Sequence, residues 1–398
     1  MSDGAPGSRA GRPRGIFGGS AWRIGRVAGI DLAIDHSWIL IFLLITFSLA
    51  GRFGVEHEDW SSLERWSAAL LASPLFFLSI LLHELGHSLT AMRFGISARS
   101  ITLFVFGGVA QLESEPKRPG HEVVIALAGP LVSVALGIGF YGLAYLFPLS
   151  LQPWGVLKAA FGWLGTINLL LAGFNIVPGF PLDGGRVLRG IVWARTGSFE
   201  RATAIAAAVG SSFAFGLIGL GIIAVFFGGQ WIAGLWLAFI GWFLLTAARA
   251  TVGQAVLERI LVTVRAIDSM ASARDACLSG YESVEEIVAG PVLQGGLRTF
   301  FVVDRDEQLR GLITLRELTS VPAAERRLKT VQEIMVPMSE LAVLGPADSG
   351  WVAFRRMAER NVNQLPVVEQ GRLLGAVTRE QLLSLVEAEL ALGIETRG

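Results

Sequence analysis

Six long apolar runs alternate with short polar segments over roughly the first 250 residues of the chain. The runs cover residues 36–51, 67–92, 122–147, 155–177, 203–227 and 231–249. A helix needs about 20 apolar residues to cross the hydrocarbon core of a bilayer, and most of these runs reach that length. The first run is shorter, so its limits are the least defined. The pattern predicts a polytopic α-helical membrane protein with about six transmembrane helices.

The segment 98–113, ARSITLFVFGGVAQLE, follows a different pattern. It alternates, is rich in β-branched and aromatic residues, and breaks at two glycines, which is typical of a β-hairpin. Non-helical backbone persists at membrane depth only where it is buried in protein or lines a wet cavity. We therefore expect a membrane-embedded β-hairpin here, with an exposed strand edge at 101–106. An amphipathic surface loop is the alternative.

Charge divides the chain into two parts. Residues 1–254 contain 13 Asp and Glu, whereas the shorter remainder contains 20. We expect a disordered basic tail over 1–29, a membrane domain over 30–254 and a cytoplasmic α/β domain after it. The whole chain has 33 basic and 33 acidic residues, which argues against a nucleic-acid partner. Its single cysteine excludes an intramolecular disulfide framework.

The basic residues of the short loops predict the orientation in the membrane. If the N-terminus is inside, the inner segments of the first 254 residues hold 14 Lys and Arg and the outer segments hold 3. Cytoplasmic loops carry the excess of basic residues. We therefore expect a multi-pass protein of the cell membrane with both termini in the cytoplasm.

The second apolar run contains a motif typical of metal chemistry. Residues 78–92 read LSILLHELGHSLTAM, with His83 and His87 four residues apart. Two such histidines share one helix face and can reach one zinc ion, and Glu84 beside them is placed to act as a general base. Ionisable residues inside a membrane helix are costly and mark function by default. The alternative, a pair of core histidines bonded to carbonyls, is less favoured.

A catalytic zinc needs a third protein ligand. The other histidines, His36, His57 and His121, lie at span edges or in an outer loop. Asp183 follows the fourth apolar run, in a segment whose prolines fix irregular backbone at the cytoplasmic end, the same depth as the histidines. We therefore favour Asp183 as the third ligand. The alternative is a turn carboxylate that caps the next helix.

Three segments together resemble the site-2 protease family of intramembrane zinc metalloproteases. They are HELGH at 83–87, AGPLVS at 128–133 and FNIVPGFPLDGGRVLRG at 174–190. The resemblance covers roughly residues 30–230. It implies regulated intramembrane proteolysis of a membrane-anchored protein substrate, with one catalytic Zn²⁺ per chain. The implied site residues are the zinc ligands His83, His87 and Asp183, the base Glu84, and Asn175 near the scissile carbonyl.

The part after residue 254 contains an internal repeat. FFVVDRDEQLRGLITLRELTSV at 300–321 parallels LPVVEQGRLLGAVTREQLLSLV at 365–386. Each unit reads strand, turn, strand and helix. The repeat resembles a tandem pair of cystathionine-β-synthase (CBS) domains, which we place at 255–320 and 321–398.

The CBS resemblance implies dimerisation and an adenine nucleotide bound between the repeats. Thr314, Glu317 and Thr378 occupy positions that contact the nucleotide in that family. Glu317 replaces the family's aspartate in the first repeat and Gln381 replaces it in the second, so a purely structural or dimerising pair is an equal alternative.

Two other classes of protein are compatible with parts of the sequence. One is a CBS-gated transporter or channel, in which intramembrane His, Glu and Asp relay protons. That class predicts topology repeats or broken helices in both halves, and the sequence contains neither. The other is a protease-like scaffold without catalysis, which normally lacks the glutamate or a ligand.

Overall fold

The computed structural model describes residues 21–105, 107–147, 154–293 and 298–392. It divides into two compact units, Met1–Val252 and Gly253–Gly398. The boundary between them falls two residues before the one predicted from the sequence, 254/255. Helix α7 (Trp231–Thr263) runs across this boundary without a break.

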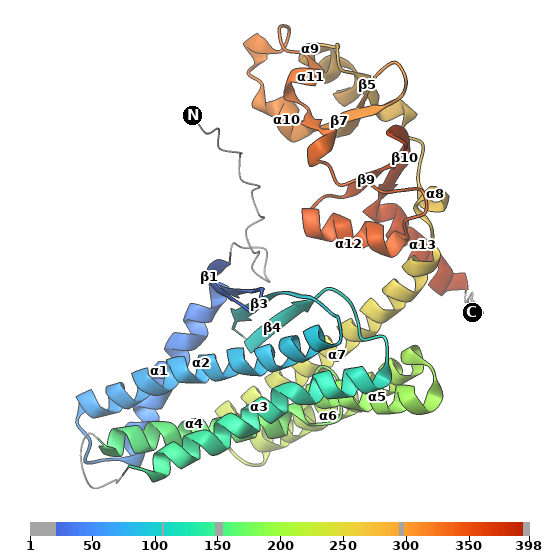
Figure 1. The fold of residues 1–398 in the computed structure, drawn as a ribbon. Helices are drawn as coiled ribbons and strands as arrows, with labels where there is room; N and C mark the ends of the chain where they lie inside the picture. The colour runs from blue at the N-terminus through green and yellow to red at the C-terminus, as the bar shows by residue number, and fades with distance from the viewer. Residues whose placement is uncertain (1–20, 106, 148–153, 294–297, 393–398) are drawn as a thin grey trace. The chain divides into compact units, whose positions relative to one another are not determined.

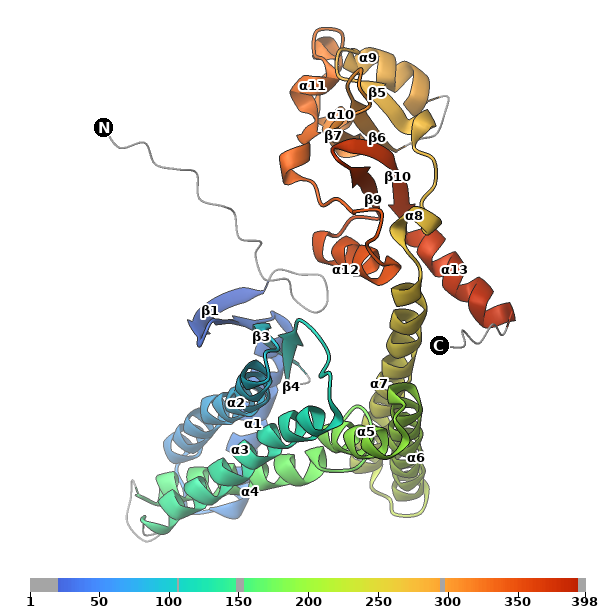
Figure 2. The same ribbon diagram turned by 45° about the vertical axis from the view of Figure 1, so that its right-hand side comes forward.

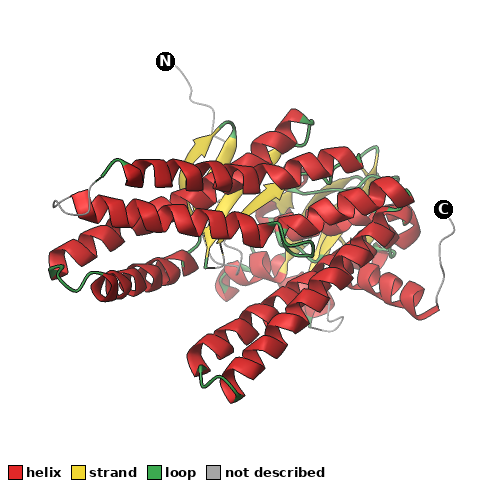
Figure 3. Ribbon diagram, turned by 90° about the horizontal axis from the view of Figure 1, so that it is seen from below, coloured by secondary structure: helices red, strands yellow, loops and turns green. Residues whose placement is uncertain are grey.

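The first unit is a bundle of long helices that lie side by side (Figures 1 and 3). Its other helices are α1 (Ser37–Glu56), α2 (Ser62–Arg93), α3 (Pro119–Tyr145), α4 (Trp154–Asn175), α5 (Asp183–Thr196) and α6 (Phe199–Phe226). All but α5 are long and apolar enough to cross a membrane, which gives six candidate spans within the described residues. The predicted six-span membrane domain is therefore confirmed.

A four-stranded sheet belongs to the same unit and lies along α2 (Figure 1). Its strands are β1 (Trp22–Val27), β2 (Ile30–Ile34), β3 (Ala98–Phe104) and β4 (Gly107–Leu112), in the order β1-β2-β3-β4. β2 and β3 pair in parallel, and the other neighbours pair antiparallel. Ile30, Leu32 and Ile101 from the sheet pack in one core with Leu81 and Leu85 of α2. This core fixes the sheet against the turns of α2 that carry the histidines.

The sheet corrects two expectations. Residues 22–27 form strand β1, so the expected disordered tail over 1–29 is wrong for this part; residues 1–20 lie outside the described residues. The hairpin at 98–112 exists, but β3 is bonded on both sides and offers no free edge. The free edge on this side of the sheet belongs to β4. The depth of the hairpin in a membrane stays a prediction.

The second unit contains two small strand assemblies (Figure 2). The first is a sheet in the order β5-β6-β7-β8 and the second is the antiparallel pair β9–β10. The strands are β5 (Cys277–Ser279), β6 (Thr299–Val303), β7 (Leu309–Thr314), β8 (Val336–Pro337), β9 (Gln364–Glu369) and β10 (Arg372–Thr378). The helices after α7 are α8 (Ala266–Ser269), α9 (Val284–Ile287), α10 (Leu315–Ser320), α11 (Val331–Ile334), α12 (Gly350–Arg360) and α13 (Arg379–Leu392).

The cores of the second unit do not follow the predicted boundary at 320/321. Val331, Ile334 and Met335 pack with the first repeat, in the core around Phe300 and Ile313. The second repeat includes residues from far upstream, in a core with these members: Ile260, Leu261, Ala266, Leu344, Ala353, Met357, Leu365, Val367, Val377, Leu382 and Val386. The limits of 255–320 and 321–398 stay a prediction, and each of the two cores combines residues from both sides of position 320.

Candidate active site

The two histidines of the HELGH motif lie on one face of α2. Both side chains are buried, and their ring centroids are 4.9 Å apart. The intervening Gly86 allows α3 to approach, since a Cβ there would come within 3.1 Å of the Ala128 carbonyl oxygen and 2.9 Å of the Val132 side chain. A helix this close brings its backbone against the histidine rings.

Asp183 joins the histidines although it lies about a hundred residues further along the chain. Its Oδ2 is 3.2 Å from the Nε2 atom of His83 and 3.2 Å from that of His87. The two Nε2 atoms are also 3.2 Å apart. In a tetrahedral zinc site with bonds of 2.0–2.1 Å, neighbouring ligand atoms lie about 3.3–3.4 Å apart. The three atoms therefore form one face of such a tetrahedron and could hold a metal ion.

Helix α3 fixes the orientation of both rings. The Nδ1 of His87 is 2.8 Å from the carbonyl oxygen of Ile125, and the Nδ1 of His83 is 2.8 Å from the Oγ of Ser133. A carbonyl only accepts, so the Nδ1 of His87 carries a proton, and in the neutral ring its Nε2 presents a lone pair toward Asp183. The hydroxyl of Ser133 can accept a hydrogen bond from the Nδ1 of His83 in the same way. Such outer hydrogen bonds are the usual support of zinc-binding histidines.

Gly129 of α3 directly faces the two Nε2 atoms. A Cβ at this position would lie 2.2 Å from the Nε2 of His87 and 2.6 Å from that of His83. No side chain fits there. The glycine therefore keeps open the space in which the three candidate ligands meet.

Asp183 is held in place by its backbone neighbours. It is the first residue of α5, and the residue at the N-cap is Leu182, which makes no side-chain cap. The interpretation of Asp183 as a capping carboxylate is therefore wrong. A Cβ on Gly184 would lie 2.3 Å from the carbonyl oxygens of Ile176 and Val177, so the chain passes very close to the end of α4.

Glu84 lies between the two histidines of α2 and Asn175 ends α4, and neither belongs to the group of residues that could hold the metal ion. A Cβ on Gly108 of strand β4 would lie 2.6 Å from the Cγ of Glu84, so the glutamate lies against the edge strand. Asn175 is the last residue of α4 and is partly buried. The backbone that follows it contacts Gly184, next to Asp183.

The sequence did not reveal the roles of α3 in the site. Ser133, Ile125 and Gly129 hold or accommodate the histidines, and the signal for two of them was the AGPLVS run at 128–133. A separate buried residue, Asn168, bonds the Oγ of Ser79 on α2 and the carbonyl oxygen of Leu164. Asn168 therefore makes an interhelical hydrogen bond one turn before His83.

The residues predicted to contact an adenine nucleotide lie in the second unit. The Oε2 of Glu317 accepts bonds from the backbone N and the Oγ1 of Thr314, at 2.9 and 2.5 Å. Gln381 makes the same pair of contacts with Thr378, both at 3.0 Å. Each threonine thus caps the helix that follows its strand.

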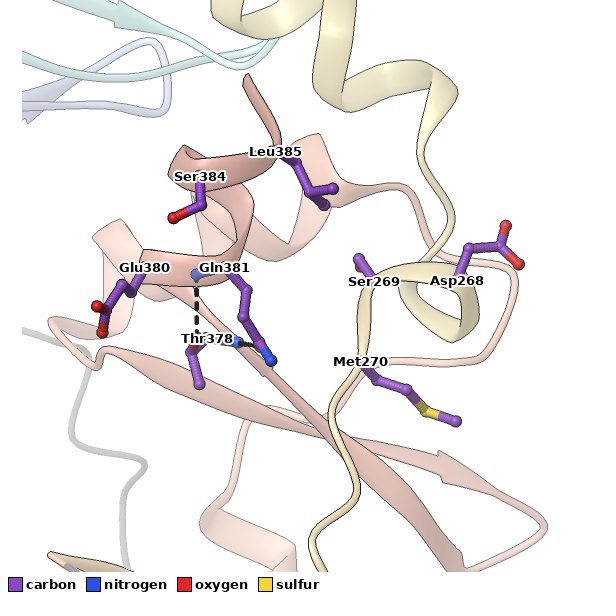
Figure 4. A pocket seen from close by; sticks show the side chains of 8 residues that line it. All are labelled: Asp268, Ser269, Met270, Thr378, Glu380, Gln381, Ser384 and Leu385. Atoms are coloured by element: carbon purple, nitrogen blue, oxygen red, sulfur yellow. Dashed lines mark hydrogen bonds between the residues drawn. The ribbon is translucent and has the colours of Figure 1, made fainter. Parts of the chain in front are cut away.

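One cavity of about 600 Å³ lies beside the second of these caps (Figure 4). It is lined by Asp268, Ser269, Met270, Thr378, Glu380, Gln381, Ser384 and Leu385. Thr378 therefore lines a cavity that could admit a small ligand, whereas Thr314 and Glu317 are not among its lining residues.

Comparison with known proteins shows the class of protein that this fold and site define. Residues 71–153 and 149–218 match peptidase family M50, and residues 331–388 match the CBS domain. The chain is 35% identical to a protein of Mycobacterium tuberculosis named as zinc metalloprotease Rip3, over 92% of each chain. It is 32% identical to the Synechocystis protein sll0528, also named as a zinc metalloprotease, over 95% of this chain and 98% of that one.

Among solved structures, the site-2 protease from Methanocaldococcus jannaschii is 30% identical, with a TM-score of 0.41, and covers 58% of this chain and 95% of its own. The chain belongs to the peptidase M50, or site-2 protease, family of zinc metalloproteases. It is a multi-pass intramembrane protease with a C-terminal CBS domain. The alternative of a CBS-gated transporter is not favoured, since the relatives that match along both parts are named as metalloproteases.

The geometry at Gly129 gives a direct test of the centre. Gly129→Ala should remove most of the bound zinc, because the new methyl group would occupy the space between the two Nε2 atoms. Zinc content of the purified protein, measured by mass spectrometry, checks this. Gly139→Ala on the same helix is the matched control, since no atom lies within 4 Å of its Cβ position. Equal zinc in the two variants would contradict the assignment.

Proposed function

We propose that His83, His87 and Asp183 hold the catalytic zinc and that Glu84 is the general base. The observation that carries this proposal is the meeting of three candidate ligand atoms at mutual distances of 3.2 Å. A zinc ion bound there would polarise the scissile carbonyl and lower the pKa of the attacking water toward neutrality. Glu84 takes the proton from that water and passes it to the leaving amine. Asn175 donates an amide hydrogen bond to the carbonyl oxygen that gains charge.

The substrate is a membrane-anchored protein cleaved in or near its transmembrane segment. A helical substrate keeps its carbonyls in internal hydrogen bonds, so the cleaved segment must become extended. The free edge of β4 is suited to bind an extended segment by strand addition. Gly108 of this strand contacts Glu84, so a strand added there would pass close to the general base. Water reaches the centre from the cytoplasmic side, near Asp183 and the partly buried Arg186.

The cytoplasmic location of both termini is part of the proposal. An even number of spans, six candidates among the described residues, supports both ends of the membrane domain lying on one side, and the basic loops favour the cytoplasmic side. The end of α2, the start of α3 and the end of α4 all lie on that side, so the centre opens toward the cytoplasm.

We also propose that the CBS pair is regulatory and dimerises. The cavity beside Thr378 offers the hydroxyls of Ser269 and Ser384 to an adenine nucleotide. Helix α13 exposes Leu383 and Leu390, which are seven residues apart and so lie on one helix face, and this suits an interface with a second copy. Light scattering of the purified protein tests the dimer, and a monomer at micromolar concentration would contradict it.

The ligand assignment predicts the metal content of three variants. His83→Ala, His87→Ala and Asp183→Ala should each hold well below the single zinc ion of the wild-type chain, because each loses one of three protein ligands. Elemental analysis of protein purified without added metal measures this. His57→Ala, in which a ring stacked on Trp60 is lost, is the control and should keep its zinc. A full complement of zinc in His83→Ala would refute the proposal.

The role of Glu84 predicts a variant that is inactive but keeps its metal. Glu84→Gln should lower the cleavage rate by about two to four orders of magnitude, the typical contribution of an acid–base group, with zinc unchanged. Cleavage of a membrane-anchored reporter measures the rate.

The same variant, bound to an uncleaved substrate, should show slowed amide exchange over 107–112, because an added strand would cover the edge of β4. Near wild-type turnover would exclude Glu84 as the base, and unchanged exchange would exclude strand addition.

The cavity in the second repeat predicts where a nucleotide binds. Calorimetry with ATP, ADP and AMP on the full chain should give binding that Thr378→Ala weakens and Thr314→Ala retains. Both variants lose a helix cap, but only Thr378 lines the cavity. The absence of binding to the wild-type chain at millimolar nucleotide would leave the pair as a dimerisation module.

A further inference from the structure

Arg189 of α5 is buried between two carboxylates. Its Nε donates to the Oε1 of Glu122 at 2.6 Å, and its Nη2 donates to the Oε2 of Glu115 at 3.0 Å. The side chains of Arg189 and Glu122 are 5% and 0% exposed, whereas that of Glu115 is 52% exposed. The arginine therefore has one buried partner and one partner in contact with solvent.

Aromatic rings cover the guanidinium. Its central carbon lies 5.1 Å from the ring centroid of Phe180 and 4.4 Å from that of Phe199. The Oε2 of Glu122 is buried and has no hydrogen-bond partner among the described residues. In such apolar surroundings an ion pair is weakly screened, and its geometry is fixed more strictly than at a surface. The pair is therefore a rigid link between the elements that carry it.

These elements are the ones that build the metal centre. Glu122 lies on α3, one turn before Ile125, whose carbonyl oxygen orients His87. Arg189 lies on α5, which begins with Asp183. The two helices touch at the next residue, since a Cβ on Gly190 would lie 3.0 Å from the carbonyl oxygen of Pro119.

Glu115, the exposed partner, connects Arg189 to strand β4, the proposed substrate-binding edge. Glu115 lies three residues after β4, the strand that contacts Glu84. Two residues earlier, Glu113 pairs with Arg99 of β3 at 2.8 Å, an ion pair that joins the ends of the two hairpin strands. Glu115, in contrast, ties the end of the edge strand to the helix of the third candidate ligand.

We propose that Arg189 is a positioning residue that aligns the metal centre through Glu122 and the substrate-binding edge through Glu115. The inference rests on the proposed function, since it takes Asp183 as a ligand and β4 as the receiving edge. It assigns different consequences to the two carboxylates: the buried one acts on metal geometry and the exposed one on substrate affinity.

The buried link is tested by Glu122→Gln in the full chain. Loss of a direct hydrogen-bond partner of a metal ligand typically weakens metal affinity roughly 10- to 100-fold, and Glu122 acts one step further away, through Arg189. We expect a loss at the lower end of this range, about tenfold, for zinc, measured by competition with a chelator, and a changed visible absorption spectrum of the cobalt-substituted protein. Zinc affinity and a cobalt spectrum equal to wild type would overturn this half of the inference.

The exposed link is tested by Glu115→Gln, with Glu113→Gln as the matched control. Both variants neutralise a partly exposed carboxylate that forms an ion pair with an arginine, and the two positions are two residues apart. Glu115→Gln should raise KM for a membrane-anchored reporter about two- to fivefold, as expected for a solvent-exposed pair, with kcat and zinc affinity unchanged. Glu113→Gln should leave all three values unchanged. Equal KM in the two variants would overturn this half.

Arg189→Lys separates positioning from simple charge balance. Lysine keeps the charge but lacks the planar fork that serves two carboxylates. Arg189→Lys should therefore show both the weakened zinc affinity and the raised KM. Its thermal unfolding should stay cooperative, which shows that the variant is folded. A KM and a zinc affinity equal to wild type would overturn the inference. A wild-type chain that binds no zinc would instead refute the proposed function, so the two failures are distinguishable.

Discussion

The close approach of α3 to α2 is the constraint on which the rest of the site depends. Gly86 and Gly129 remove the side chains that would keep the two helices apart, and the second of them clears the space in front of both Nε2 atoms. Only then can the Ile125 carbonyl and the Ser133 hydroxyl reach the far side of the rings. The helix contact and the orientation of the histidines are thus one feature, because the atoms that hold the rings are part of the packing surface.

Much of the membrane domain could be predicted from the sequence, because length and hydropathy define a membrane helix locally. The HELGH motif and the depth of Asp183 were enough to bring together residues about a hundred positions apart. The supports on α3 were not accessible in the same way. A glycine such as Gly129 carries no chemical signal of its own, and a backbone carbonyl such as that of Ile125 is invisible in a sequence.

The errors arise where the partner of a segment is not visible in the pattern of the segment itself. Strand β1 was assigned to a disordered tail because its composition is basic and glycine-rich, whereas its pairing partner β2 fixes it as a strand. The β3 edge was expected to be free because local alternation cannot reveal the parallel partner β2, which lies across a helical hairpin. In the second unit, too, Leu261 packs with residues about a hundred positions downstream, which the local pattern does not reveal. The β3 edge therefore depends on a contact between distant segments, whereas β1 depends on a strand only two residues further along the chain.

The parallel pairing of β2 with β3 has a consequence for shortening the chain. The segment 22–34 reads as a dispensable leader, but it covers one side of β3 and contributes Ile30 and Leu32 to the core on α2. A truncated protein starting at α1 would lose β1 and β2, so the edge of β3 would be unpaired. That edge would compete with β4 for any extended polypeptide and for other copies of the protein. Truncation at the first helix would therefore lower the selectivity for substrate and favour self-association, and a shortened protein should keep the segment 22–34.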